Sequence, residues 1–321
     1  MKTTVVGSYP KPKWLLRMIK LHKDGKVDDK VMDEAYKDAV KAVVKDHEIA
    51  GVDIIWDGEM RREEMTSYFA ERIDGFVIYG EVRVWGNAYY PKPSIVGELR
   101  YRDELAINDF LYLRSITDKE IKVPITGAYT IVDWSFNEYY PSKEEAVYAL
   151  AEVLNKEFRE LVKVGAKYIQ IDEPAIPTHP EEIEIAKNAV EIMVKGVNAY
   201  IGMHMCYGNY RAIFPEILDF KVDQIDFEFA NRNFEDLAIL KEYDYDKDLG
   251  FGCIDVHSRR VETVEEVKKA IYMALEIVEP DQLYVDPDCG LKLLPRDIAF
   301  EKLKVMVQAT NEVRKELGIA E

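Results

Sequence analysis

The most constraining feature of the sequence is a regular alternation of short apolar runs with longer segments of helical periodicity. Strands that alternate with helices form right-handed β-α-β units, and such units build a parallel sheet. Eight apolar runs in 321 residues are enough to close a barrel. We therefore predict an α/β fold, a (β/α)8 TIM barrel with functional residues at the carboxyl ends of its strands. The expected strands are 4–7, 52–56, 123–126, 168–171, 200–203, 224–227, 251–254 and 283–285.

The segments between these runs carry apolar residues about every 3.6 positions, which predicts the helices that cover the barrel. Ser142 is expected to cap one of them, because Glu144 and Glu145 follow it in what would be the first turn. The expected helices are 31–50, 105–116, 142–162, 182–194, 264–278 and 296–313.

One stretch, residues 81–101, does not follow the repeat. Residues 82–87 alternate between apolar and polar, residues 89–93 contain two prolines typical of a turn, and residues 94–97 are largely apolar. This pattern predicts a β-hairpin excursion after the second strand. An irregular surface loop is the alternative.

Composition limits the partners that this chain can have. The net charge of -17 disfavours nucleic acid and anionic membranes, because phosphate groups are bound by stripes of Lys and Arg. No apolar run reaches the roughly 20 residues of a membrane span, and no linker-like segment divides the chain. We expect one domain over residues 1–321. The amino terminus lacks a signal-peptide pattern, which predicts a cytoplasmic protein.

Polar residues collect directly after the predicted strands. Core packing does not require acids, His and Cys at one end of every strand, so this distribution indicates an enzyme. The clusters are Gly7-Ser8, Asp57-Gly58-Glu59, Trp134-Ser135, Asp172-Glu173-Pro174, His204 with Cys206, Glu228, Asp255-Val256-His257-Ser258, and Asp286-Pro287-Asp288-Cys289.

Four residues in these clusters predict a metal site: His204, Cys206, Glu228 and Cys289. Imidazole, thiolate and carboxylate together suit Zn²⁺ in tetrahedral geometry. The ligands are too far apart in sequence for a zinc finger, and three unpaired cysteines are too few for a disulfide scaffold. A buried His and a small packing Cys are the alternative for the first pair. Glu228 is more telling, because a carboxylate within an apolar run needs a cation or strong donors.

Other candidates have simpler alternatives. Glu59 and Asp172 could hold an amine between them, could cap helices, or could form the acid/base pair of a glycosidase. Gly7-Ser8 could bind a carboxylate or simply turn the chain, and Trp134 could stack on a ring or pack in the core. His257 is the candidate for proton transfer near neutral pH, and a core imidazole bound to Asp255 is its alternative.

Taken in order, these motifs resemble the catalytic half of cobalamin-independent methionine synthase, over almost the whole chain. The matching pieces are Val6-Gly7-Ser8, Gly58-Glu59, Ile125-Thr126-Gly127 with Trp134-Ser135, Ile171-Asp172-Glu173-Pro174-Ala175, His204-Met205-Cys206-Tyr207, Phe227-Glu228, Asp255-Val256-His257-Ser258 with Arg260, and Asp288-Cys289-Gly290-Leu291-Lys292.

The resemblance implies specific roles for these residues. It places zinc on His204, Cys206, Glu228 and Cys289, where it would activate the thiol of homocysteine for methylation to methionine. It assigns the amino and carboxylate groups of homocysteine to Gly7, Ser8, Glu59 and Asp172. It also implies that Trp134 faces the methyl donor and that His257 assists proton delivery.

Two departures from the family concern the methyl donor. The long members carry a second, amino-terminal barrel that this chain lacks, and Thr178 stands where they have a second Glu after the Asp-Glu-Pro turn. The short form is similar to stand-alone archaeal members, which implies a modified methyl-pterin, a methyl-corrinoid, or a donor presented by a separate companion protein.

Three other functions remain open from the sequence. One is a related zinc-thiol methyltransferase or thiol-adding enzyme that acts on a different thiol. Another is a non-catalytic zinc-binding partner subunit, which the retained substrate residues disfavour. The third is a metal-dependent hydrolase, but such barrels usually carry His-x-His after the first strand, where this chain has Gly7-Ser8.

Overall fold

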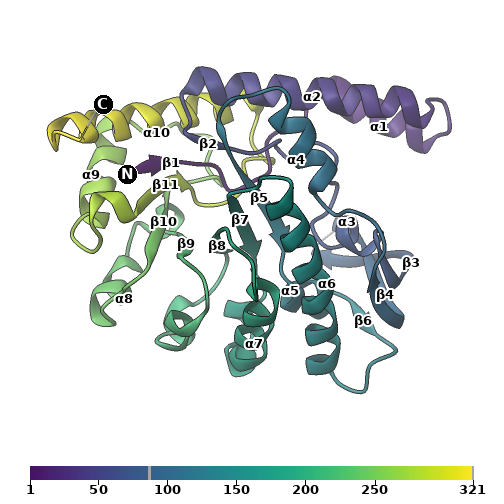
Figure 1. Ribbon diagram of the computed structural model, residues 1–321. Helices are drawn as coiled ribbons and strands as arrows, with labels where there is room; N and C mark the ends of the chain where they lie inside the picture. The colour runs from purple at the N-terminus through teal and green to yellow at the C-terminus, as the bar shows by residue number, and fades with distance from the viewer. Residues whose placement is uncertain (86–87, 320–321) are drawn as a thin grey trace.

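The computed structural model describes residues 1–85 and 88–319 and shows eight parallel strands arranged as a barrel (Figure 1). Neighbouring strands follow the order β1-β11-β10-β9-β8-β7-β5-β2. The predicted α/β barrel is therefore confirmed. The strands are β1 Lys2–Thr3, β2 Ile54–Ile55, β5 Glu120–Thr126, β7 Tyr168–Asp172, β8 Tyr200–Met205, β9 Gln224–Glu228, β10 Asp248–Ile254 and β11 Leu283–Pro287.

The first strand lies nearer the amino terminus than the sequence predicted. Lys2 and Thr3 pair with Tyr284 and Val285 of β11, whereas residues 5–7 are buried without strand pairing. The apolar run marks which residues are buried, and burial continues beyond the last paired residue. The prediction of 4–7 was thus wrong in its bounds.

The barrel closes between β1 and β2, largely through side chains. A parallel bridge joins Thr4 to Ile54, and the Thr4 hydroxyl donates to the Ile54 carbonyl at 3.1 Å. The Asp53 carboxylate accepts from the backbone N–H of Thr3 at 2.8 Å, and the Thr3 hydroxyl accepts from the N–H of Asp53 at 3.0 Å. These four residues join the two ends of the sheet.

The helices cover the outside of the barrel (Figure 1). Ser142 caps α6 as predicted, with its hydroxyl accepting from the Glu145 N–H at 3.1 Å. No helix within the described ranges is long and apolar enough to cross a membrane. The helices are α1 Lys13–Lys23, α2 Asp29–Ala50, α3 Ser67–Ala70, α4 Ile107–Arg114, α5 Ala128–Asp133, α6 Lys143–Lys163, α7 Ile183–Val194, α8 Leu237–Glu242, α9 Val264–Ala274 and α10 Arg296–Glu316.

A second, smaller sheet lies beside the barrel (Figure 1). Its long strands, β3 Ile73–Trp85 and β4 Ala88–Tyr101, pair antiparallel, and β6 Phe136–Asn137 joins β4. The turn predicted over 89–93 was wrong, because these residues belong to β4 and pair with β3. The last two positions of the predicted alternation, Gly86 and Asn87, lie outside the described residues.

Candidate active site

Three of the four predicted metal ligands come together at the carboxyl ends of β8 and β11. One ligand atom from each of His204, Cys206 and Cys289 lies within 4.8 Å of the others. The two sulfur atoms are 3.8 Å apart, and no disulfide joins them. His204 is the fifth residue of β8 and Cys206 follows its last residue, so one strand end supplies two of the three groups.

The geometry of this group fits a zinc ion. Two thiolates bound tetrahedrally, each about 2.3 Å from zinc, lie roughly 3.8 Å apart, as these sulfurs do. The Nε2 atom of His204 is buried and has no hydrogen-bond partner among the described residues. A buried polar nitrogen without a partner is costly, and coordination to a cation would satisfy it.

Asp226 orients the imidazole of His204. Its carboxylate lies 2.9 Å from Nδ1, which leaves Nε2 available as the ligand atom. Burial lowers the pKa of His204, but the Asp226 carboxylate outweighs it and holds the pKa well above the ordinary value. Gly250 on β10 makes room for this carboxylate, since a Cβ atom there would lie 2.4 Å from the Cβ of Asp226.

The two thiols affect each other's ionisation. Their mutual contact, aided by His204, holds the pKa of Cys289 well below its ordinary value. The same contact and burial raise the pKa of Cys206.

Glu228, the fourth predicted ligand, lies beside this group but not within it. Its Oε1 atom accepts from the backbone N–H of Tyr207 at 2.8 Å, while Oε2 is buried without a partner. Burial raises the pKa of Glu228. Tyr207 reaches it in a left-handed backbone conformation, with φ of 54°, directly after Cys206. One carboxylate oxygen is thus fixed by the backbone and the other is free to bind.

Asp288 braces the loops that carry Glu228 and Cys289. One oxygen accepts from the N–H groups of Phe229 and Ala230 at 2.9 and 2.8 Å, and the other accepts from Asn231 at 2.8 Å. These donors directly follow Glu228, while Asp288 directly precedes Cys289. The hydrogen bonds therefore fix the end of β9 relative to the end of β11.

Two predicted substrate residues, Gly7 and Glu59, lie against each other. A Cβ atom on Gly7 would come within 2.8 Å of Glu59 Oε1. Glu59 has φ of 56°, and its N–H donates to the Asp57 carboxylate at 2.7 Å. Lys11 donates to the Glu59 carbonyl at 2.8 Å. Buried Arg62 also lies 3.4 Å from Glu59 Oε1. Because a non-glycine residue at positive φ is strained, these contacts together help to hold Glu59 in place.

Ser8 lies next to the loop that carries Cys289. A Cβ atom on Gly290 would overlap the Ser8 hydroxyl, at 2.0 Å, and the Ser8 carbonyl accepts from the N–H of Leu291 at 2.8 Å. Since Gly290 follows Cys289, the predicted substrate side of the site adjoins the predicted metal side.

Asp172, the last residue of β7, does not cap a helix. Its carboxylate accepts from the side chain of Gln170 at 2.7 Å. Burial raises its pKa to about 7, and the negative charge of Glu59 adds to the shift, whereas His204 opposes it. A buried carboxyl group close to a second carboxylate suits a positively charged ligand such as an amine.

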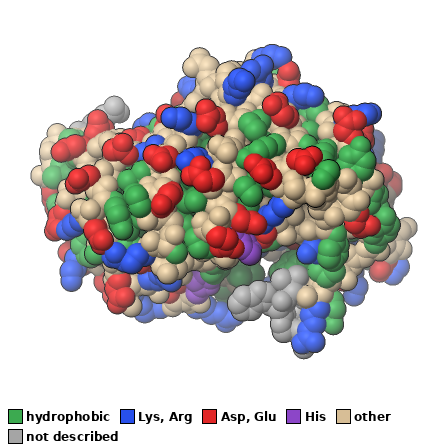
Figure 2. All heavy atoms as spheres, turned by 90° about the horizontal axis from the view of Figure 1, so that it is seen from below, with side chains coloured by type: hydrophobic (Ala, Val, Ile, Leu, Met, Phe, Trp, Pro, Cys, Tyr) green, Lys and Arg blue, Asp and Glu red, His purple; other side chains and the backbone are tan. Residues whose placement is uncertain are grey.

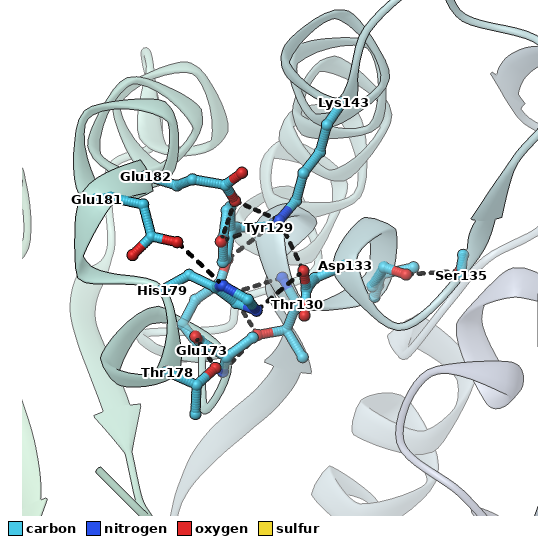
Figure 3. A network of polar contacts seen from close by, with 12 residues as sticks. Tyr129, Thr130, Asp133, Ser135, Lys143, Glu173, Thr178, His179, Glu181 and Glu182 are labelled. Atoms are coloured by element: carbon cyan, nitrogen blue, oxygen red, sulfur yellow. Dashed lines mark hydrogen bonds and ion pairs between the residues drawn. The ribbon is translucent and has the colours of Figure 1, made fainter. Parts of the chain in front are cut away.

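The residue after Asp172, Glu173, has the capping role instead. It accepts from the N–H groups of Tyr129 and Thr130, at 3.1 and 2.8 Å, in the first turn of α5 (Figure 3). Gly127 is required beside it, because a Cβ atom there would lie 1.9 Å from the Glu173 carboxylate. Glu173 thus joins the end of β7 to the helix whose C-cap is Trp134.

A polar network surrounds α5 (Figure 3). Lys143 at the start of α6 donates to Asp133 at 2.6 Å and to the Tyr129 hydroxyl at 3.0 Å, and it also pairs with Glu182. His179 lies 3.6 Å from Asp133. The network links the loops after β5 and β7, whereas Trp134 itself is 38% exposed.

His257 is exposed, so the alternative of a core imidazole is wrong. Its backbone N–H, not its ring, binds Asp255, at 2.8 Å. The ring contacts Tyr207 edge-on, with centroids 5.4 Å apart. Figure 2 shows histidine side chains beside a hollow in one face of the molecule, among acidic and apolar groups.

Comparison with known proteins agrees with this arrangement. A family described as "Cobalamin-independent synthase, Catalytic domain" matches residues 1–312. The chain belongs to this family. Its members include the methionine synthase of Pyrococcus furiosus, 52% identical over 318 residues, which are 99% of this chain and 94% of that protein. The methionine synthase of Saccharolobus solfataricus is 50% identical, over 99% of this chain and 96% of that protein.

A solved structure is similar throughout. It is a B12-independent methionine synthase from Shewanella sp. W3-18-1 in complex with selenomethionine, with a TM-score of 0.88 and 27% identity. The comparison covers 98% of both chains. Membership of the synthase family thus rests on both sequence and fold.

Several residues that build this synthase site were not assigned roles from the sequence. They are Lys11, Glu173, Tyr207, Asp226 and Asp288. Asp226 had a usable signal, because it lies two positions before Glu228 on one strand and so faces the same side. Lys11, Glu173 and Asp288 bind backbone groups of distant loops, and Tyr207 offers its own backbone N–H to Glu228, so local sequence carries no sign of these contacts.

Proposed function

We propose that this protein transfers a methyl group to the thiol of L-homocysteine and forms methionine. The convergence of His204, Cys206 and Cys289 at one end of a family barrel is the observation that carries the proposal. Glu228 would be the fourth ligand of a zinc ion, through its unpartnered Oε2. A zinc ion bound there supplies a position at which a substrate thiol loses its proton and remains nucleophilic.

The amino-acid part of homocysteine would occupy the adjoining residues. Glu59 and Asp172 would bind its ammonium group, and Gly7 with Ser8 would bind its carboxylate. Holding both charged groups aligns the sulfur with the incoming methyl group, which lowers the entropic cost of reaction. The Shewanella relative binds selenomethionine, the selenium analogue of the proposed product, which supports an amino-acid subsite.

The donor would be a methyl-pterin or a methyl-corrinoid, with Trp134 as a stacking surface for its ring system. A pterin nitrogen must gain a proton as it leaves, and His257 would supply that proton. Its exposed ring could reach a large ligand held over the site. A separate companion protein could present the donor.

The decisive experiment replaces one proposed ligand. Cys289→Ser should lose bound zinc and methionine formation together, because a neutral hydroxyl is a poor substitute for a thiolate. Cys253→Ser is the matched control, since Cys253 is a buried cysteine that lies outside the ligand group. Retention of both zinc and activity in Cys289→Ser would overturn the proposal.

The donor is identified by assaying purified protein with methyl-folate, a methyl-pterin and methylcobalamin, each supplied alone. Turnover with one of them identifies the donor class. Competition between homocysteine and other thiols then tests the acceptor, and preference for another thiol would favour the related thiol methyltransferase.

A further inference from the structure

We propose that a buried ion pair outside the active site, Lys302 with Glu262, positions His257 for proton transfer. This inference rests on the proposed function, because it concerns the imidazole assigned to the leaving group there. Both residues are positioning residues, since neither belongs to the site itself.

The pair is deeply buried. Lys302 lies on α10 with no exposed surface, and its ammonium group lies 2.9 and 2.8 Å from the two oxygens of Glu262. Glu262 lies in the loop between β10 and α9, and 10% of its side chain is exposed. The loop that carries His257 is therefore tied to a helix at the back of the barrel.

From Glu262 the contacts lead to His257 along the backbone. Glu262 Oε1 accepts from the N–H of Asp255 at 3.2 Å, and Asp255 Oδ1 accepts from the N–H of His257 at 2.8 Å. Val256, between them, is buried. Three consecutive residues are thus fixed by two hydrogen bonds and one packed side chain.

On its other side, the imidazole is placed relative to the metal ligands. Its ring packs edge-on against Tyr207, whose N–H donates to Glu228 Oε1 at 2.8 Å. Without the Glu262 acceptor, the loop would lose its tie to α10 and keep the packing of Val256, the local hydrogen bond between Asp255 and His257, and this ring contact. An exposed ring with a single contact has no fixed position.

Stability alone does not explain this pair. Replacement of a buried ion pair by apolar residues is often neutral or stabilising, whereas loss of one partner leaves a costly buried charge. Other lysines of α10 form pairs at the surface, as Lys304 does with Glu301 at 3.1 Å. A role in fixing the loop accounts for a charged pair inside the protein.

The test compares two double variants that both remove the ion pair. Lys302→Met with Glu262→Gln keeps an oxygen that can accept from Asp255, whereas Lys302→Met with Glu262→Leu does not. We expect the first to keep kcat within about twofold and the second to lose roughly ten- to hundredfold, as for a misplaced catalytic group. The KM for homocysteine and the zinc content should be unchanged in both.

Equal kcat values in the two double variants would overturn the inference, as would a loss confined to KM or zinc content. Lys304→Met is the surface control and should resemble the wild type. If the leucine variant does not fold, Lys302→Ala with Glu262→Ala removes the same acceptor and carries the same comparison.

A third comparison separates this inference from the proposed function. In a His257→Ala background, the change from the glutamine to the leucine variant should alter kcat less than about twofold, because no imidazole remains to be misplaced. A persistent tenfold loss there would overturn the positioning role. Full activity of His257→Ala alone would instead overturn the proton-transfer role of His257.

Discussion

The metal end of the site and its aromatic side are built in different ways. The metal end consists of His204, Cys206, Glu228 and Cys289, and the aromatic side consists of α5, β6 and the strands β3 and β4. At the metal end, Asp226 and Asp288 bind the ligand residue itself or the backbone beside it. On the aromatic side, rings remain exposed: Trp134 at 38%, Phe136 at 48% and Tyr139 at 51%.

This difference teaches where the protein is preorganised. A tetrahedral metal site would tolerate little movement, and buried hydrogen bonds from Asp226 and Asp288 already fix the His204 ring and the backbone that follows Glu228. A large donor ring gains binding energy from flat exposed surface instead. The following predictions, in order of decreasing effect, test the contrast.

The largest effect should come from Asp288→Ala. Three backbone N–H groups would lose their acceptor, and at about 1–3 kcal/mol for each unpaired group the free energy of unfolding should fall by roughly 3–9 kcal/mol. Denaturant unfolding measures this loss. The exposed Asp38→Ala should show no detectable change, and equal losses in the two variants would break the contrast.

Asp226→Asn should weaken zinc binding by roughly 10- to 100-fold, because the partner of a metal-bound imidazole sets its orientation and basicity. Competition with a chelator measures the affinity. Asp223→Asn is the control, since Asp223 binds the Ile201 N–H at the opposite end of the sheet. Unchanged affinity in Asp226→Asn would mean that the metal end is not braced through His204.

Methionine binding should strengthen by up to about tenfold per pH unit as the pH rises towards 7 and should then level off. Asp172 has a pKa raised to about 7, and an ammonium ligand binds its ionised form. Because the folded protein holds this proton and the unfolded chain does not, the same group lowers folding stability as pH rises from about 4 to 7.

Titration calorimetry with methionine avoids the ionisation of a substrate thiol. Asp172→Asn should bind more weakly and lose most of the pH dependence. An unchanged pH profile in that variant would assign the dependence to another group.

The smallest effect should come from Trp134→Ala. Loss of one stacking surface, worth about 1 kcal/mol, should raise the KM for the methyl donor roughly fivefold and leave the KM for homocysteine unchanged. Phe136→Ala, which removes a more exposed ring two residues later, should change the donor KM less. Equal effects on the donor KM would show that Trp134 is not the main stacking surface for the methyl donor.

Most of the barrel could be predicted from two patterns. Buried parallel strands are continuous apolar runs, and the covering helices carry apolar residues about every 3.6 positions. The predictions of the bounds of β1 and of a turn over 89–93 were wrong for the same reason. Hydrophobicity indicates which residues are buried, whereas the pairing of a strand depends on which strands lie beside it. The two prolines of 89–93 lie within β4, a strand outside the barrel sheet.

The convergence of His204, Cys206 and Cys289 could be predicted because all three stand at the ends of apolar strands. Glu228, which stands in an apolar run, lies beside them. The bracing role of Asp288 could not be predicted, since its partners are backbone groups. Asp288 binds N–H groups nearly sixty positions earlier in the chain. These hydrogen bonds depend on the backbone conformation of the loops, such as the positive φ at Tyr207. Residue type does not specify that conformation.

The junction between β1 and β2 has a consequence for heat inactivation. Thr3, Thr4 and Asp53 join the two strands mainly through side-chain hydrogen bonds. Two point substitutions could therefore remove these bonds while the backbone pairing between the other strands of the barrel stays intact. Gly7 lies a few residues after β1, and Glu59 lies a few residues after β2. We expect gradual warming to separate the ends of β1 and β2 first. The proposed binding of the amino acid would then be lost at a lower temperature than the proposed binding of the cation.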